Sequence, residues 1–194
     1  MLPYTFEVFS LDHIVSIIVI LFLFIIFLGY NDKIGIEDDS KTFLIVLSIL
    51  MIFLDLSEDL VRIFTGYYSI TKDLPLQLCS IGVYLAAFNL MYRNQTIFNL
   101  IFYWGFVGAT NAILTPDGDL FELRIFFFYS QGYHAALIFA VLWMMIKYDM
   151  RMDYRSILQV VIYTNIIVGL ITIVNYLLDS NYMFLRVMPN SISP

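Results

Sequence analysis

Six long apolar runs constrain the fold of this chain more than any other feature. They cover residues 13–29, 42–64, 75–92, 96–114, 123–146 and 156–178. Each is close to the roughly 20 residues that a helix needs to cross a bilayer. The runs are too long for barrel strands and do not alternate with a two-residue period. The sequence therefore predicts an all-α membrane protein, a polytopic bundle of six transmembrane helices.

Composition supports this class and limits the partners. Hydrophobic residues make up 61% of the 194 and charged residues 13%, whereas a soluble domain carries about 25% charged residues. Residues 1–194 are expected to form a single transmembrane helical domain in contact with membrane lipids. The net charge of −6 argues against a nucleic-acid partner. No sequence motif for a metal or a cofactor is present, and none is expected.

Basic residues in the short loops predict the orientation in the membrane. The loops after the first, third and fifth runs hold Lys33, Lys41, Arg93, Lys147, Arg151 and Arg155. The opposite side holds Lys72, Arg124 and Arg186, with Arg62 placed inside the bilayer. We expect the first set to be cytoplasmic and both termini to be extracytoplasmic. The expected location is the cell membrane, as a multi-pass protein.

Polar residues gather toward the extracytoplasmic ends of all six runs. This set, the outer polar layer, comprises Asp12, His13, Glu58, Gln77, Cys79, Asn111, Thr115, Gln131, His134 and Asn175. The cytoplasmic halves of the runs are much plainer. Because polar groups inside a membrane mark functional sites by default, the layer is the candidate site.

The second run carries the densest charges of the layer. Asp55, Glu58, Asp59 and Arg62 are spaced i, i+3, i+4 and i+7, which places them on one helix face. Glu58 and Arg62 are in the favourable order for an ion pair. Such a face points into the bundle or into a water-filled cavity. It is either a functional site or a structural ion pair that fixes helix packing.

Four stretches together resemble a known family. They read "FSLDH", "LPLQLCSIGVYL", "YWGFVGATNAILTPDG" and "NYLLDSNYMFLR". In this order they resemble the YwaF-type bacterial integral membrane proteins, which are grouped with the transmembrane protein 164 family. The resemblance spans about residues 9–186. The signature residues of the family match His13, Glu58, Pro75, Cys79, Thr115, Pro116, Asp117, Asn175, Asn181 and Tyr182.

This resemblance implies a bundle of six or seven helices and, in the eukaryotic branch, acyl transfer to ether phospholipids with a cysteine nucleophile. The sequence departs from the pattern at two sites. Gln77 and Gln131 stand where relatives often carry histidine, and His134 lies one turn beyond Gln131. The chain also ends at Pro194, before the seventh helix that relatives often have.

Two functions from different classes follow. The first is an enzyme that acts on lipids, with Cys79 as nucleophile, His13 or His134 as base and Glu58 as orienting acid. Its candidate substrate-binding residues are Asp55, Arg62, Gln77, Asn111, Asp117, Gln131, Asn175, Asn181 and Tyr182. The alternative is a protein that binds or transports a small molecule in the same layer. Cys79 also has a plain interpretation as a small packing residue. The substrate, the reaction and the oligomeric state stay open.

Overall fold

The computed structural model describes residues 4–30, 41–118 and 121–188. All regular structure in these ranges is helical. The longer helices are α1 (Leu11–Tyr30), α2 (Lys41–Thr65), α3 (Leu78–Tyr92), α6 (Arg124–Lys147) and α7 (Ile157–Leu178). A sixth rod is continuous through α4 (Gln95–Ile101), the π-helical turn η1 (Phe102–Val107) and α5 (Gly108–Leu114). Two short 3₁₀ turns are η3 (Tyr154–Ser156) and η4 (Tyr182–Phe184). The predicted all-α class is confirmed for the described residues.

Local sequence explains where the helices begin and end. Gly66 follows α2 with a φ of 77°, a left-handed conformation that glycine adopts without a Cβ penalty. This geometry lets the amides of Tyr67 and Tyr68 donate to the Arg62 carbonyl at 2.9 and 3.1 Å. At the other end of the bundle, the Asn94 side chain caps α4 by accepting from the Ile97 amide at 3.1 Å.

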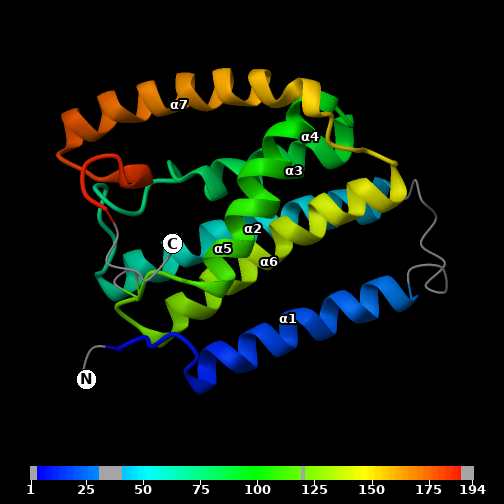
Figure 1. Cartoon of the computed structure of the whole chain (residues 1–194). Coiled ribbons are helices and arrows are strands. Elements are labelled where there is room, and N and C mark those ends of the chain that lie inside the picture. Colours follow the sequence, from blue (N-terminus) through cyan, green and yellow to red (C-terminus); the bar gives the residue numbers. More distant parts are fainter. Residues whose placement is uncertain (1–3, 31–40, 119–120, 189–194) are drawn as a thin grey trace.

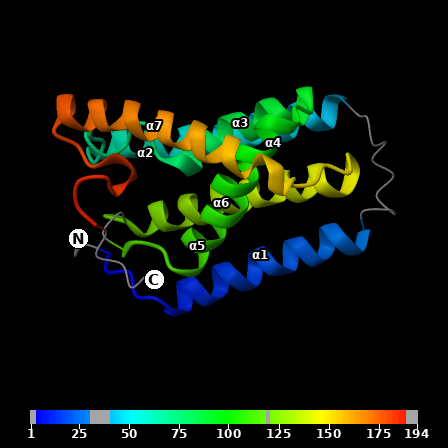
Figure 2. The same ribbon diagram turned by 45° about the horizontal axis from the view of Figure 1, so that its top comes forward.

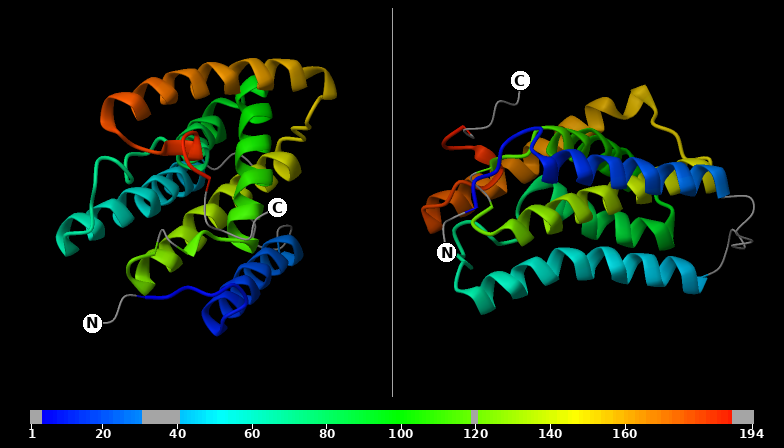
Figure 3. Two further views of the ribbon diagram at one scale, coloured as in Figure 1. Left: turned by 60° about the vertical axis from the view of Figure 1, so that its left-hand side comes forward. Right: turned by 90° about the horizontal axis from the view of Figure 1, so that it is seen from below.

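Helices α2, α3, α5 and α6 form the packed centre of the molecule. Met51, Val83, Leu90, Leu137 and Met144 are among its buried residues. α1 and α7 lie on opposite sides of this centre (Figures 1 and 2), and the turned views in Figure 3 show the same arrangement. Both outer helices expose most of their apolar side chains, which is the pattern expected of helices that face lipid.

The rod α4–η1–α5 packs closely on α6 through small residues. A Cβ added at Gly105 would lie 2.9 Å from Cγ of Leu137, and one at Gly108 would lie 3.6 Å from Sγ of Cys79. Gly105 therefore permits a helix approach that any larger residue would block. The irregular turn η1 falls at this point of closest approach.

Four helical segments are long and apolar enough to cross a membrane. They are Leu11–Gly29, Gln95–Leu114, Arg124–Lys147 and Tyr154–Leu178. α2 has 25 residues but carries four charges in its second half. α3 has 15 residues, a length of about 22 Å at 1.5 Å per residue. The structure thus supports four candidate spans, while the count of six spans and the orientation of the chain stay predictions.

Two of the loops and both ends of the described chain meet at one end of the bundle. Residues 4–10, the α2–α3 loop, the α5–α6 loop and the segment after α7 all lie there (Figure 1, left). We refer to it as the loop end. It coincides with the end of the runs where the outer polar layer was predicted.

Candidate functional site

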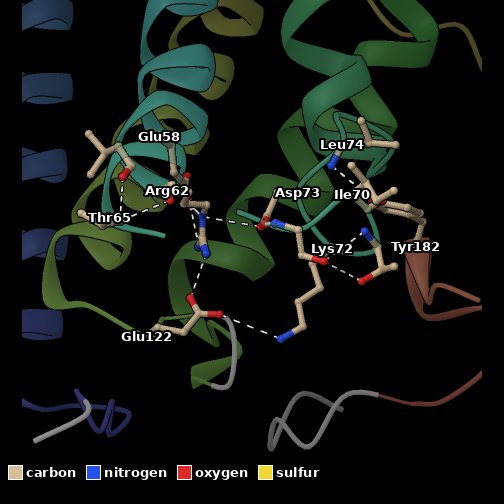
Figure 4. A network of polar contacts seen from close by, with 12 residues as sticks. Glu58, Arg62, Thr65, Ile70, Lys72, Asp73, Leu74, Glu122 and Tyr182 are labelled. Atoms are coloured by element: carbon tan, nitrogen blue, oxygen red, sulfur yellow. Dashed lines mark hydrogen bonds and ion pairs between the residues drawn. The ribbon is translucent and has the colours of Figure 1, made fainter. Parts of the chain in front are cut away.

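Arg62 is the centre of an ion-pair network at the loop end. Its Nε and Nη2 donate to Oε1 of Glu58 at 3.1 and 2.9 Å, and its Nη1 donates to Oε2 of Glu122 at 2.8 Å. Its Nε also lies 3.6 Å from Oδ1 of Asp73. The guanidinium stacks over the Phe126 ring, 4.0 Å from its centroid, and the side chain is only 6% exposed. Figure 4 shows one cation joined to carboxylates from three segments.

The α2–α3 loop is held over this network from the carboxyl-terminal side. Asp73 accepts from the Ser69 amide at 2.7 Å, which folds the loop on itself. The Tyr182 hydroxyl donates to the Ile70 carbonyl at 2.6 Å and accepts from the Leu74 amide at 3.1 Å. Burial raises the pKa of Tyr182 above its ordinary value, so the hydroxyl stays a neutral donor. Tyr182 therefore pins the loop to the segment after α7 (Figure 4).

Asn175 and Asn181 shape the segment that carries Tyr182. Oδ1 of Asn175 accepts from the Tyr182 amide at 2.7 Å and from the Ser180 hydroxyl at 2.8 Å, and its Nδ2 donates to the Tyr182 carbonyl at 2.9 Å. Asn181 binds the backbone of Arg186 and Val187. Both asparagines were predicted to bind substrate, but the structure places them as backbone anchors.

A cavity of about 100 Å³ lies beside the Arg62 network. α2 lines it with Asp55, Glu58, Asp59 and Arg62. The remaining walls come from the α2–α3 loop, Ser80 of α3, Phe121, and Ser130 and Tyr133 of α6. We call it the polar cavity. It confirms that the charged face of α2 points into the bundle.

The remaining carboxylates of α2 differ in their partners. Asp55 accepts from the Tyr84 hydroxyl of α3 at 2.8 Å. Asp59 lines the polar cavity but makes no hydrogen bond or ion pair to another side chain that the structure describes. A carboxylate that leaves water without a partner carries a large desolvation penalty. Asp59 is therefore the carboxylate best placed to meet a bound group.

Gln77 is the other predicted site residue that reaches the polar cavity. Its Oε1 accepts from the Met183 amide at 2.9 Å. This bond joins the start of α3 to the segment after α7. Gln77 thus lines the polar cavity, but its Oε1 already accepts a hydrogen bond.

His13 and Asp12 tie the start of α1 to its neighbours. The fully buried His13 ring receives the Phe9 amide on Nδ1 at 3.0 Å, and its Nε2 is 2.8 Å from the Ile113 carbonyl. Nε2 must therefore carry the proton and donate. Asp12 accepts from Arg124 and from the Tyr4 hydroxyl. Burial, followed by this hydrogen bond to Asp12, raises the pKa of Tyr4 to about 12. Both nitrogens of His13 have partners, so its predicted role as a base lacks a free nitrogen.

Cys79 and His134 do not form a catalytic pair in this structure. The Cys79 thiol donates to the Trp104 carbonyl in η1 at 3.8 Å and packs on Gly108. His134 Nδ1 lies 2.7 Å from the Ser130 carbonyl, within its own helix. Neither residue lines the polar cavity. The polar cavity thus takes its lining from α2, α3, α6 and two loops, and the catalytic roles expected for Cys79 and His134 stay predictions.

Three further predicted residues lie away from the polar cavity. Asn111 is exposed on α5, and Asp117 is half-buried in the α5–α6 loop. Gln131 is 3% exposed, and its two amide atoms have no hydrogen-bond partner among the described residues. An unpaired buried polar group costs about 1–3 kcal/mol, so this glutamine needs an explanation.

Glu122, Asp73, Tyr84 and Phe126 belong to the site but were not predicted. Glu122 and Asp73 are loop acids, and Phe126 is one of 18 phenylalanines in the chain. Their position next to the ends of runs at one face was the only available signal. Among the described residues, no cluster of His, Cys, Asp or Glu is arranged to hold a metal ion.

The fold and the cavity define a polytopic helical membrane protein with a charged cavity at one end of its bundle. A family model supplies the relationship: the chain belongs to the TMEM164 family, whose model matches residues 8–194. No curated protein and no solved structure matches the chain. The narrower assignment to the YwaF-type branch stays a prediction.

Proposed function

We propose that this chain binds a small ligand through a positively charged group, such as a protonated amine, in the polar cavity. The observation that carries the proposal is the excess of carboxylates around Arg62. Among the described residues, four acidic side chains line the cavity, and the cations beside them are Arg62 and Lys72. Glu122 adds a fifth carboxylate at the edge of the network. A cation in the cavity would offset this excess.

The two cations present do not balance these charges. Arg62 is shared among Glu58, Asp73 and Glu122. Lys72 is 62% exposed, and its Nζ is 3.9 Å from Glu122, a geometry that contributes little. Asp55 and Asp59 thus face the cavity without an ion-pair partner among the described residues. Asp55 is buried and Asp59 is half-buried, so a charge on either carboxylate is costly without a partner, and a bound cation would lower that cost.

The cavity size limits what can enter. Its volume of about 100 Å³ exceeds the 10–15 Å³ or so that one water needs, yet lies below the roughly 300–1,000 Å³ of drug-sized ligand sites. A compact amine or the polar head of an amphiphile fits, whereas a whole lipid does not. By the charge rule for loops, the cavity opens to the extracytoplasmic side of the cell membrane.

The contacts favour binding or transport over a lipid-directed reaction. Acyl transfer by Cys79 would require a base within hydrogen-bond reach of the thiol. The hydrogen bonds of Cys79, His13 and His134 instead go to backbone groups of Trp104, Ile113 and Ser130. The polar cavity itself offers charge and hydrogen-bond acceptors, and its lining, as far as the chain is described, includes neither Cys79 nor a histidine.

Thermal unfolding in detergent tests the proposal. Ethanolamine should raise the unfolding temperature, while ethylene glycol, its uncharged counterpart, and sodium acetate at matched ionic strength should not. Saturating ligand stabilises the folded state by RT ln(1 + [L]/Kd), about 2.7 kcal/mol at 100 times Kd. Asp59→Asn should remove the shift. Asp149→Asn, the same change at an exposed aspartate in the α6–α7 connection, should retain it. Equal shifts with all three solutes would refute a cation site.

A further inference from the structure

A second cavity lies on the opposite face of α6 from the polar cavity. It has a volume of about 560 Å³ and runs between α1, α2 and α6. On α6 its walls include Gln131, Gly132, Ala135 and Phe139. At 100° per residue, these positions point away from Ser130 and Tyr133, which line the polar cavity. We call this second cavity the apolar groove.

The lining of the apolar groove matches hydrocarbon. Valine, isoleucine, leucine, phenylalanine, alanine and glycine make up its walls apart from Ser16 and Gln131. The Ser16 hydroxyl already donates to the His13 carbonyl at 2.8 Å. α1 and α6 both have the length and hydropathy of membrane-crossing helices. The groove between them therefore meets lipid tails rather than water.

The length of the groove matches one acyl chain. It extends along α6 from Phe128 to Phe139, which is about 16 Å at 1.5 Å per residue. This equals about half of the roughly 30 Å hydrocarbon core, the depth of one leaflet. A single acyl chain of a lipid in that leaflet therefore fits along the groove.

Gln131 supplies an independent sign of a ligand. It lines the groove, is 3% exposed, and its amide nitrogen and oxygen have no partner among the described residues. Buried amides are almost always hydrogen-bonded. The terminal torsion of glutamine has broad preferences, so a small rotation turns Nε2 toward an acceptor in the groove. A carbonyl oxygen at the head of an acyl chain is such an acceptor.

From these observations we infer that the apolar groove binds one acyl chain of a membrane phospholipid, with the carbonyl of that chain accepting a hydrogen bond from Gln131. The site is separate from the polar cavity and does not depend on the function proposed for it. The bound chain would lie between α1 and the centre of the bundle, beside the place where Phe27 packs on Phe139 and Trp143. It would also satisfy the unpaired amide.

Photolabelling in vesicles tests this inference. The probe is a phosphatidylcholine with a diazirine in its acyl chain, and labelled peptides are located by mass spectrometry. A Cβ at Gly132 meets nothing within 4 Å, so Gly132→Leu should fill the groove without a backbone clash. Labelling of α1 and α6 groove peptides should then fall several-fold. Gly169→Leu makes the same change at an equally open glycine of α7 and should leave this labelling unchanged.

A competition arm examines Gln131. Unlabelled ester phosphatidylcholine should displace the probe from the wild type better than the ether-linked lipid, which has no carbonyl. Gln131→Leu should abolish that preference while keeping the label in the groove. Groove labelling that Gly132→Leu and Ala136→Leu both leave unchanged in folded protein would overturn the proposal. So would labelling of α7 equal to that of the groove, or a wild type without preference for the ester.

Discussion

Arg62 donates to a single oxygen of Glu58 through both Nε and Nη2, at 3.1 and 2.9 Å. The i, i+4 pair expected from the sequence is therefore present and largely buried. It is one part of a larger network, because the same guanidinium also meets Asp73 and Glu122. The loops before α3 and before α6 are thus both fastened to α2.

The first prediction concerns the unequal weight of the two partners. Arg62→Ala should destabilise the fold by roughly 3–5 kcal/mol, because it leaves several carboxylates near one another without their cation. Glu58→Ala should cost less, since Asp73 and Glu122 still balance the arginine. Unfolding followed by tryptophan fluorescence in detergent measures both. If both single variants were as stable as the wild type, the charges would face water.

The double variant Glu58→Gln/Arg62→Met tests whether Glu58 and Arg62 act as an isolated ion pair or as part of the larger network. A pair with no other partners would lose little when both charges are removed together. Here the double variant should recover only part of the loss caused by Arg62→Ala, because Asp73 and Glu122 remain unpaired. The cycle is completed by the matching single variants Glu58→Gln and Arg62→Met. A coupling energy close to the full cost of Arg62→Met would instead reduce the site to an isolated pair.

A second prediction concerns the close contact of the α4–η1–α5 rod with α6. Gly105→Ala places a Cβ 2.9 Å from Leu137, and such overpacking typically costs about 1–3 kcal/mol. Gly108→Ala is the matched control, because its Cβ meets Cys79 at an ordinary 3.6 Å. It should be neutral or slightly stabilising. Equal melting temperatures for the two variants would show that the rod can shift on α6.

A third prediction addresses the thiol. Cys79 is directed at Trp104 and Gly108 and does not line the polar cavity. A small permeant alkylating agent should modify it slowly in native membranes. Gln77→Cys in a Cys79→Ser background places a thiol on the cavity wall and should react much faster. Faster reaction of Cys79 than of the cavity thiol would restore the case for a cysteine nucleophile.

A fourth prediction concerns topology. Ile70 and Met152 are exposed at opposite ends of the bundle, and the distribution of basic residues predicts that Met152 is cytoplasmic. In a Cys79→Ser background, Ile70→Cys should react with an impermeant maleimide added to intact cells. Met152→Cys should react only after the membrane is opened. The reverse pattern would invert the orientation.

Sequence periodicity was sufficient to predict the helices and the inward charged face of α2. Apolar run length fixes each helix, and the spacing of Asp55, Glu58, Asp59 and Arg62 fixes their common side. The sequence also placed the polar residues toward the correct ends of their helices. Depth along a helix follows directly from residue number.

Run length and residue spacing do not predict how far each helix is rotated about its own axis. His13 and Cys79 lie toward the same end of the bundle as Glu58, yet they are directed at the backbone carbonyls of Ile113 and Trp104. His134 bonds a carbonyl of its own helix. Glu122 and Asp73 join the site through loop conformations set by Tyr182 and Ser69. Contacts of this kind depend on tertiary packing, which one sequence does not reveal.

Equilibrium dialysis of radiolabelled ethanolamine against the purified protein tests the cation site most directly. The wild type should bind it saturably, with one equivalent per chain, and excess unlabelled ethylene glycol should not compete. Asp59→Asn should lose this binding while melting at or above the wild-type temperature in the absence of ligand, because it removes an uncompensated charge. Binding that never saturates, or that is the same in Asp59→Asn and in the wild type, would contradict a cation site in the polar cavity.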